Sequence, residues 1–525
     1  MGNALPSIPV NFISIVLALL PILVVLILLV SFRMAADLAG LIGLGTALLT
    51  AWLYFHTPPS ILLRAGLSGV VASFPITIMV VTSLLQIFIM IATGALSRIV
   101  VLVKTIAPGD QVIQIMIVNV GFGTLLAAMG ATPVSILPPI MLALGYSSFV
   151  AIALPALGYD ALCTYALLGV PVVVFAGLVD LPVNEVGGYF ARFMPIISTC
   201  IALGMLWLVG KWPLVWKGLL PALLSGLTAG AIAIGMNAVR LIPLTGVAAG
   251  PGVILVMLAY LLILRRPLRD RSALTDADQA VERRMPLWIA ASPWIILTVF
   301  AVLVNLPSLP FYNLTFKSLA MPVEIIPGAA EKVRLFWQAY FWILVSTALA
   351  LPLLKPTRQQ LGDAFSKWIK RAPRPMLASA IFFAIAYIMN HSGRELDWAL
   401  VEPQRNMVAV LASASSAAFG RSYPLIAPYL GLLAGFVSGS EASAIAMLTR
   451  LHLSTAEQIG AAGLLVAAAS GIGGGLASVI SPAKLQNAAA AIDRIGEEAG
   501  VLRVTFVISL VITLVCAVMA LVWAY

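Results

Sequence analysis

Two acidic residues lie in stretches of sequence that are otherwise almost entirely apolar. Glu441 follows the run Ser438-Gly439-Ser440, and Asp160 follows Gly158-Tyr159. Burying an ionisable side chain among apolar segments of this kind costs roughly 2.5–3.5 kcal/mol or more, so each acid indicates a function or a definite structural role. A carboxyl group in a low-dielectric site can exchange a proton near neutral pH. We assign proton coupling to both acids; the alternatives are a cap at a hairpin tip for Glu441 and a helix N-cap for Asp160.

Small polar residues near these acids, and at other helix ends, are candidates for binding a carboxylate. Free N–H groups and the positive end of the helix dipole at a half-helix N-terminus would add to their attraction. A hydrogen bond to a backbone carbonyl is the alternative role for any single serine. Lys484 could also meet a carboxylate, but its position after Ser481-Pro482 better fits the cytoplasmic end of a helix. The candidate substrate-binding residues are Ser438, Gly439, Ser440, Ser443, Thr132, Tyr159, Ser470, Gly471, Asn390 and Ser392.

The composition identifies the elements that must position these residues. The chain has 525 residues, of which 62% are hydrophobic and 10% charged, whereas a soluble domain carries about 25% charged residues. Apolar runs long enough to cross roughly 30 Å of hydrocarbon recur throughout, and the short alternating segments of a membrane barrel are missing. We expect an all-α polytopic membrane protein with about 11–13 membrane segments. The clear spans are expected at residues 13–32, 36–54, 70–94, 190–209, 218–236, 245–264, 287–305, 335–353, 375–390 and 504–524.

The charges between spans predict the orientation. The net charge of +10 arises in loops, and basic loops stay in the cytoplasm. Loops 265–284 and 355–374 should therefore be cytoplasmic and 306–334 external. Both chain ends then come out external, and the first apolar run reads as a retained span rather than a signal peptide. Counting back places Arg98 and Lys104 inside and Asp180 and Glu185 outside, with Arg64 as the single mismatch.

Four hydrophobic stretches contain too much Gly and Pro for simple spans. Residues 111–145 and 423–451 read as re-entrant helical hairpins, because Gly and Pro release backbone groups that lipid cannot satisfy. Residues 148–179 and 457–482 read as broken helices, with interrupted segments of equal length at Tyr159–Pro171 and Ser470–Pro482. Ordinary helix kinks are the alternative.

The order of these elements repeats along the chain. We expect a first repeat at 1–210, an extra helix pair with a basic cytoplasmic loop at 211–286, and a second repeat at 287–525. By the charge count the two repeats have opposite orientations. Paired interruptions in inverted halves are the best sequence indication of a midplane binding site in an ion-transporter-like fold.

Other classes of protein find little support. There is no Gly-x-x-x-x-Gly-Lys-Ser/Thr loop for ATP. The three cysteines and three histidines are scattered, without the spacing of a metal site or a nucleophile–base pair. We therefore expect no enzyme activity, cofactor, metal or nucleic-acid partner. A channel stays open as an alternative.

At its motifs the chain resembles the bacterial lactate permease family, secondary carriers of L-lactate and glycolate. The resemblance covers nearly the whole chain, although identity outside the motifs is low. The motifs that carry it in the second half are Asn390-x-Ser392-Gly393, Ser438-Gly439-Ser440-Glu441-x-Ser443, Gln458-Ile459-Gly460, Gly473-Gly474 and Ile480-Ser481-Pro482. Those in the first half are Phe122-Gly123, Pro133-Val134, Leu144-Gly145, Gly169-Val170-Pro171, and Arg192 with Pro195.

The chain departs from the family pattern where a site is expected. Its first hairpin tip, Leu126–Pro133, lacks the acid of the family, and the family's Asn-Thr pairs are here Tyr159-Asp160 and Ser470-Gly471. The tip Asp of the second hairpin is Glu441. The lysine before Ile-Ser-Pro is Ser478, with Lys484 downstream. Asp160 could therefore be the missing hairpin acid, moved across the site.

The resemblance implies proton-coupled symport of a small carboxylate across the bacterial inner membrane. Lactate, glycolate or a related 2-hydroxy acid would be the substrate. Another organic anion, or Na⁺ in place of the proton, is the alternative within the same fold. The expected partners are the carboxylate, the ion and the lipid bilayer, and a homodimer stays open.

Overall fold

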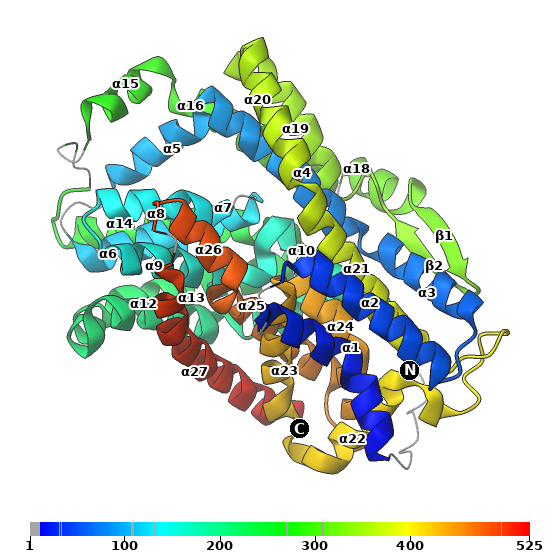
Figure 1. Ribbon diagram of the computed structural model, residues 1–525. Coiled ribbons are helices and arrows are strands. Elements are labelled where there is room, and N and C mark those ends of the chain that lie inside the picture. The colour runs from blue at the N-terminus through cyan, green and yellow to red at the C-terminus, as the bar shows by residue number, and fades with distance from the viewer. Residues whose placement is uncertain are drawn as a thin grey trace.

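The computed structural model describes residues 11–525 except 31, 33, 107–109, 131, 269–270, 272–273, 306–308 and 495. The described chain is a bundle of helices with one small β-hairpin (Figure 1). Eight of its helices are long and apolar enough to cross a membrane, or ten if each of two bent pairs counts as one span. Five shorter apolar helices accompany them. The helical polytopic fold is thereby confirmed.

Every expected span overlaps a helix of the structure. Several of these helices, among them α4, α12 and α21, carry proline in their first turn, where a missing N–H costs nothing. In the first part the spans are α1 (Phe12–Val30), α2 (Ala36–Leu53), α4 (Phe74–Thr93), α12 (Met194–Lys217), α13 (Leu219–Ala238) and α14 (Thr245–Ile263). In the second part they are α17 (Ser292–Asn305), α19 (Ala339–Leu354), α21 (Pro373–His391) and α27 (Glu498–Ala524).

The first Gly- and Pro-rich region forms a run of short helices. The chain runs in one direction through α6, the π-helical η1 and α7, and it then turns and runs back through α8. The broken helix that follows consists of α9, η2 and α10, and it bends by 64° at the break. The bounds are α6 (Gln111–Ile115), η1 (Met116–Phe122), α7 (Gly123–Ala128), α8 (Pro133–Ala143), α9 (Ser148–Asp160), η2 (Cys163–Tyr165) and α10 (Ala166–Val179).

The second such region is more regular. Helices α23 (Tyr423–Ser438) and α24 (Glu441–Ile459) form a hairpin joined only by Gly439-Ser440. Helix α25 (Gly463–Leu476) then runs without interruption through Ser470 and the glycines, so the break comes at η7 and not at Ser470-Gly471. The chain continues through η7 (Ser478–Ile480) into α26 (Pro482–Ala490).

Shorter elements connect and cover the spans. A two-stranded antiparallel sheet, which the sequence analysis did not foresee, stands out among them in the segment expected to be external. It pairs Met321 with Val333 and Val323 with Glu331. The connecting elements include α3 (Pro59–Ala72), α5 (Ala95–Lys104), α11 (Val183–Ala191), α15 (Asp276–Arg284), η4 (Asn313–Ser318), β1 (Met321–Ile326), β2 (Ala329–Val333), α20 (Arg358–Arg371) and α22 (Met407–Phe419).

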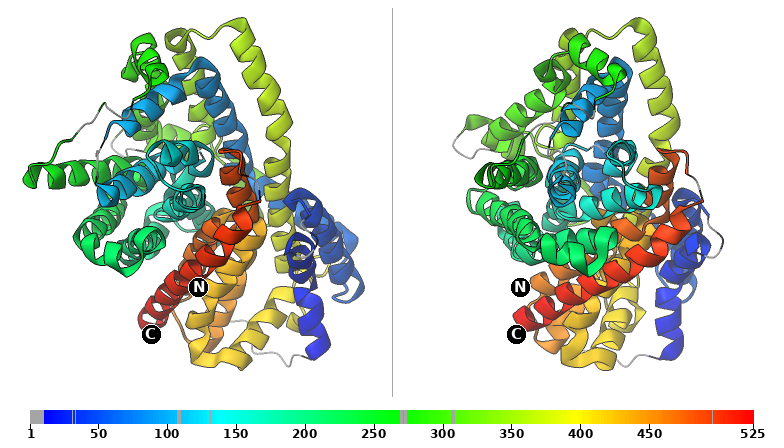
Figure 2. Two further views of the ribbon diagram at one scale, coloured as in Figure 1. Left: turned by 60° about the vertical axis from the view of Figure 1, so that its left-hand side comes forward. Right: turned by 90° about the vertical axis from the view of Figure 1, so that its left-hand side faces the viewer.

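Two ion pairs join segments that the charge count assigns to the same side of the membrane. Lys104 and Asp278 of α15, both expected inside, lie 2.9 Å apart. Lys332 and Asp180, both expected outside, lie 3.6 Å apart. Helices α15 and α20 lie at one end of the molecule, while the start of α1 and the end of α27 lie at the other (Figures 1 and 2). These placements are consistent with the expected orientation, and the inverted repeat stays a prediction.

The two Gly- and Pro-rich regions lie at the centre of the molecule. Segments Gly463–Ala489 and Gln111–Ala128 are the most buried of the eight, with 89% and 83% of their apolar windows inside the protein. Helix α10 packs on α24, and α9 packs on α26. The first broken helix therefore contacts both the hairpin and the broken helix of the second half.

Candidate functional site

Glu441 lies at this central contact. It is the first residue of α24, and its side chain is 4% exposed. The Thr164 hydroxyl, from the break between α9 and α10, donates a hydrogen bond of 2.7 Å to Glu441 Oε1. The acid of the second hairpin is therefore held by the break in the first half of the chain.

Glycines in α25 make room for this acid. A Cβ atom on Gly475 would lie 2.5 Å from Glu441 Oε2 and 3.4 Å from Cys163 Cβ. A Cβ on Gly435 would lie 2.2 Å from the carbonyl oxygen of Gly474, so α23 and α25 pack backbone to backbone. The glycine run thus permits close helix packing around the carboxyl group instead of breaking the helix.

Lys484 belongs to the same region of the molecule. Its ammonium group donates a 2.6 Å hydrogen bond to Ser478 Oγ and lies 4.0 Å from the centre of the Tyr159 ring. Ser478 Oγ is also 3.7 Å from Cys163 Sγ. Lys484 therefore faces the two breaks, where it can attract an anion, although the sequence alone favoured a helix end. We call Glu441, Thr164, Cys163, Ser478, Lys484 and Tyr159 the central network.

The hairpin tip is built from its own serines. Gly439 adopts a left-handed conformation with φ +67°, which glycine reaches without strain. The Ser438 hydroxyl donates to the carbonyl of Ser440, and the Ser440 side chain accepts from the Ser443 N–H to cap α24. A Cβ on Gly439 would lie 3.7 Å from Ser481 Oγ, so the tip touches the end of the second break.

Three polar atoms in this region are buried without a hydrogen-bond partner among the described residues. They are Glu441 Oε2, Ser443 Oγ and the hydroxyl of Tyr165, the neighbour of Thr164. Buried polar groups in proteins are nearly always paired. These three atoms therefore keep unused hydrogen-bonding capacity beside the central network.

The other acid is described only in part. Asp160 is the last residue of α9, and its side chain lies outside the described residues. The N-cap positions of the following turns are Leu162 for η2 and Tyr165 for α10. Asp160 is thus not at an N-cap position, which removes the main argument for the capping role.

The contacts of the remaining candidate binding residues involve groups outside the central network. Ser470 and Gly471 are inside α25, where Gly471 faces Ile445 and Phe190. Thr132 precedes α8 and makes no capping hydrogen bond.

Asn390 and Ser392 belong to the junction of α21 and α22. The Ser392 hydroxyl donates to the Met389 carbonyl and accepts from the Met407 N–H. Asn406 donates to the carbonyls of Asn390 and Ser392, at 2.9 Å each. These contacts hold the α21–α22 corner together, and none joins it to Glu441.

Sequence reasoning did not select Thr164, Cys163 or Ser478. Each is a small polar residue in a predicted interruption, within Tyr159–Pro171 or Ser470–Pro482. Their position in an interruption was the one signal in the sequence. It was too weak to select them, because other polar residues share that position.

Known proteins resemble this chain over nearly its full length. The L-lactate permease of Salmonella typhi is 25% identical over 98% of this chain and 96% of its own length. The glycolate permease of Escherichia coli (strain K12) is 26% identical with the same coverage. Among solved structures, the YdaH transporter of Alcanivorax borkumensis aligns over 87% of each chain at 13% identity, with a TM-score of 0.45.

The sequence profile of the L-lactate permeases matches residues 14–525. With its many apolar spans, the molecule is a multi-pass transporter of the bacterial inner membrane. The chain belongs to the L-lactate permease family.

Proposed function

We propose that this protein carries a small 2-hydroxy carboxylate, such as lactate or glycolate, together with a proton into the cell. Relatives named for L-lactate and for glycolate support the substrate class. The observation that carries the proposal is Glu441, a buried acid of one half bonded to a hydroxyl of the other half.

The coupling follows from the two oxygens of Glu441. Oε1 accepts a hydrogen bond from Thr164, whereas Oε2 has no N–H or O–H donor in the described chain and has only the weakly donating Cys163 thiol nearby. An ionised carboxylate with an unpaired oxygen is costly in apolar surroundings, so the closed arrangement suits the neutral acid. Separating α24 from the Thr164 break would expose the carboxyl to water and release its proton. Movement of one half against the other is thereby linked to proton transfer.

The substrate would bind beside this acid. The Lys484 ammonium supplies a positive charge for the carboxylate, since charge-assisted hydrogen bonds are among the strong ones. Hydroxyl groups of Ser438, Ser440 and Ser443 surround the hairpin tip and suit the substrate hydroxyl. Asp160, at the neighbouring break, would be a second proton-carrying group.

Proteoliposome uptake tests this proposal. A pH gradient, acid outside, should drive accumulation of labelled L-lactate or glycolate, and a Na⁺ gradient should not. Glu441→Gln keeps the size and hydrogen bonding of the side chain but cannot release a proton. It should abolish pH-driven accumulation while retaining part of the equilibrium exchange.

The matched control is Glu457→Gln, an exposed acid on the same helix, which should accumulate substrate like the parent. Unchanged accumulation in Glu441→Gln would leave Glu441 a structural cap. Uptake driven by a Na⁺ gradient alone would mean that Na⁺, and not the proton, is the coupling ion. Absence of counterflow would indicate a channel, because a pore cannot exchange substrate against a gradient.

A further inference from the structure

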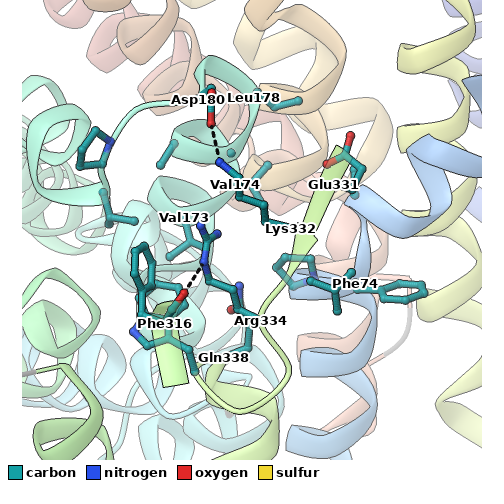
Figure 3. Close-up of a pocket in the computed structure, with 18 of the residues that line it drawn as sticks. Phe74, Val173, Val174, Leu178, Asp180, Phe316, Glu331, Lys332, Arg334 and Gln338 are labelled. Carbon is teal, nitrogen blue, oxygen red and sulfur yellow. Dashed lines mark hydrogen bonds and ion pairs between the residues drawn. The ribbon is translucent and has the colours of Figure 1, made fainter. Parts of the chain in front are cut away.

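A cavity of about 420 Å³ lies away from the central network, beneath the β-hairpin (Figure 3). Its walls come from α3, α4, α10, α11, α21, the turn after α13, the end of α17 and the segment around the two strands. None of its lining residues belongs to the central network. Part of its wall is segment 306–334, which the charge count places outside the membrane.

Strand β2 forms a bridge across this cavity. The Glu331 carboxylate turns to one wall, where it accepts hydrogen bonds from Tyr387 at 2.7 Å and Ser68 at 3.4 Å. Lys332 turns to the opposite wall, where it pairs with Asp180 of the α10–α11 connection (Figure 3). Successive side chains of a strand point to opposite faces, so one short strand fastens both walls and leaves Arg334 at the strand end.

Arg334 is held in a fixed position with part of its donor set unused. Its Nε donates to the Phe316 carbonyl at 3.1 Å, and its guanidinium group lies 4.2 Å from the Phe316 ring centre. Within the described chain the two terminal nitrogens make no hydrogen bond. Burial lowers the pKa of Arg334, but the group stays charged. Figure 3 shows the guanidinium beside Val173, on the cavity side of the strand.

The other charges of the cavity favour an anion. Arg240 and Lys332 join Arg334 in the lining, against the acids Asp180 and Glu331. Glu331 is already engaged by Tyr387 and Ser68. Asp180 is exposed, so water screens its electrostatic attraction to Lys332. A carboxylate ligand would compete with Asp180 for Lys332, and the guanidinium of Arg334 belongs to the same cavity lining.

We infer that this cavity is a second, external binding site for small monocarboxylates, centred on Arg334 and Lys332. Planar, bidentate recognition by a fixed guanidinium group suits a carboxylate. The apolar side chains Phe74, Val174 and Leu178 in the same lining suit a short aliphatic body. The inference rests on the proposed function for the identity of its ligand. It gives the carrier a place to collect substrate before the central network opens.

A protection experiment tests the site independently of transport. Val173→Cys places a thiol in the cavity wall beside Arg334, and the parent chain supplies the background labelling. A membrane-impermeant maleimide added outside should modify this thiol, and L-lactate, glycolate or acetate should slow the reaction by roughly fivefold or more. Lactamide, the neutral analogue, should not slow it. Arg334→Gln in the same background should remove the protection, and Lys317→Gln, a change on η4 outside the lining, should retain it.

A gain-of-function variant guards against misfolding as an explanation. Asp180→Asn releases Lys332, so protection should appear at lower carboxylate concentration than in Val173→Cys alone. The inference is overturned if no carboxylate protects, if lactamide protects equally, or if Arg334→Gln is protected like Val173→Cys alone. Protection by lactate in vesicles that transport no 2-hydroxy acid would uphold this site while removing the proposed function.

Discussion

The two hairpin-and-helix regions differ more in structure than in sequence. Their interrupted segments have the same length and each ends on proline. Yet the first broken helix bends by 64° and contains three consecutive left-handed residues, Leu167, Leu168 and Gly169, whereas the second continues through a short 3-10 turn into α26. The first half contributes the Thr164 hydroxyl to the central network from a sharp break. The second half contributes the Glu441 carboxyl from a regular hairpin.

The position of each proline explains why only the first segment contains left-handed residues. Pro171 lies inside α10, and the residue four positions earlier is Leu167, the one whose carbonyl a proline cannot engage. Pro482 is the first residue of α26, a position where its missing N–H is not needed. Leu167 and Leu168 adopt a conformation that costs roughly 1–3 kcal/mol each. Strain of this kind is typical of functional breaks.

Single-cysteine labelling tests the predicted topology, on which the opposite orientation of the two regions depends, with an all-or-none result. Ser318→Cys should react with an impermeant reagent from outside, and Ser366→Cys only from the cytoplasm. Ser272, a third suitable position in the first basic loop, lies outside the described residues. Reaction of Ser366→Cys from outside would reverse the orientation and end the inverted-repeat interpretation.

Among the substitutions in the two hairpin-and-helix regions, we expect the largest loss of transport from Gly475→Ala. The added methyl would lie 2.5 Å from Glu441 Oε2, and such overpacking costs about 1–3 kcal/mol. We expect transport to fall more than tenfold with normal membrane expression. Gly235→Ala, on α13 with open space around its Cβ, is the control. Parent-like uptake by Gly475→Ala would mean that the carboxyl group has a different place during transport.

Asp160→Asn decides whether the first region also supplies an acid. If Asp160 replaces the acid missing from the first hairpin, transport should be severely reduced, and an acid at Ala127 should partly restore it. Asn caps a helix about as well as Asp, so a capping role predicts an almost silent change. Uptake rates of Asp160→Asn and of Asp160→Asn with Ala127→Asp distinguish the two. Near-parent transport in the single variant would end the relocation hypothesis and leave the family assignment untouched.

A smaller loss is expected from Thr164→Val. The variant keeps the shape of the side chain but removes the hydrogen bond to Glu441, and an unsatisfied buried acceptor costs about 1–3 kcal/mol. We expect roughly a tenfold fall in uptake rate, since about 1.4 kcal/mol corresponds to a factor of ten. Thr164→Ser, which restores the hydroxyl, should recover most of it. If Thr164→Val and Thr164→Ser behave alike, the contact between the halves has no part in coupling.

Part of the candidate site could be predicted from the sequence. Glu441 was selected because an acid is rare in apolar sequence, and the structure buries it at the centre. Ser470 and Gly471 were selected because a glycine run suggests a break, but helix α25 continues through them. Glycine weakens an isolated helix, yet here backbone contact with α23 compensates. That compensation depends on a neighbouring helix that no local pattern reveals.

The sequence by itself determined the spans and the polytopic class, because hydrophobic length acts locally along the chain. Only the tertiary structure decided that Thr164, 277 residues before Glu441, donates to its carboxyl group. It also decided that Lys484 faces the two breaks and that strand β2 bridges a cavity. Each of these contacts depends on how distant helices cross, and side-chain packing, not residue type, fixes that crossing.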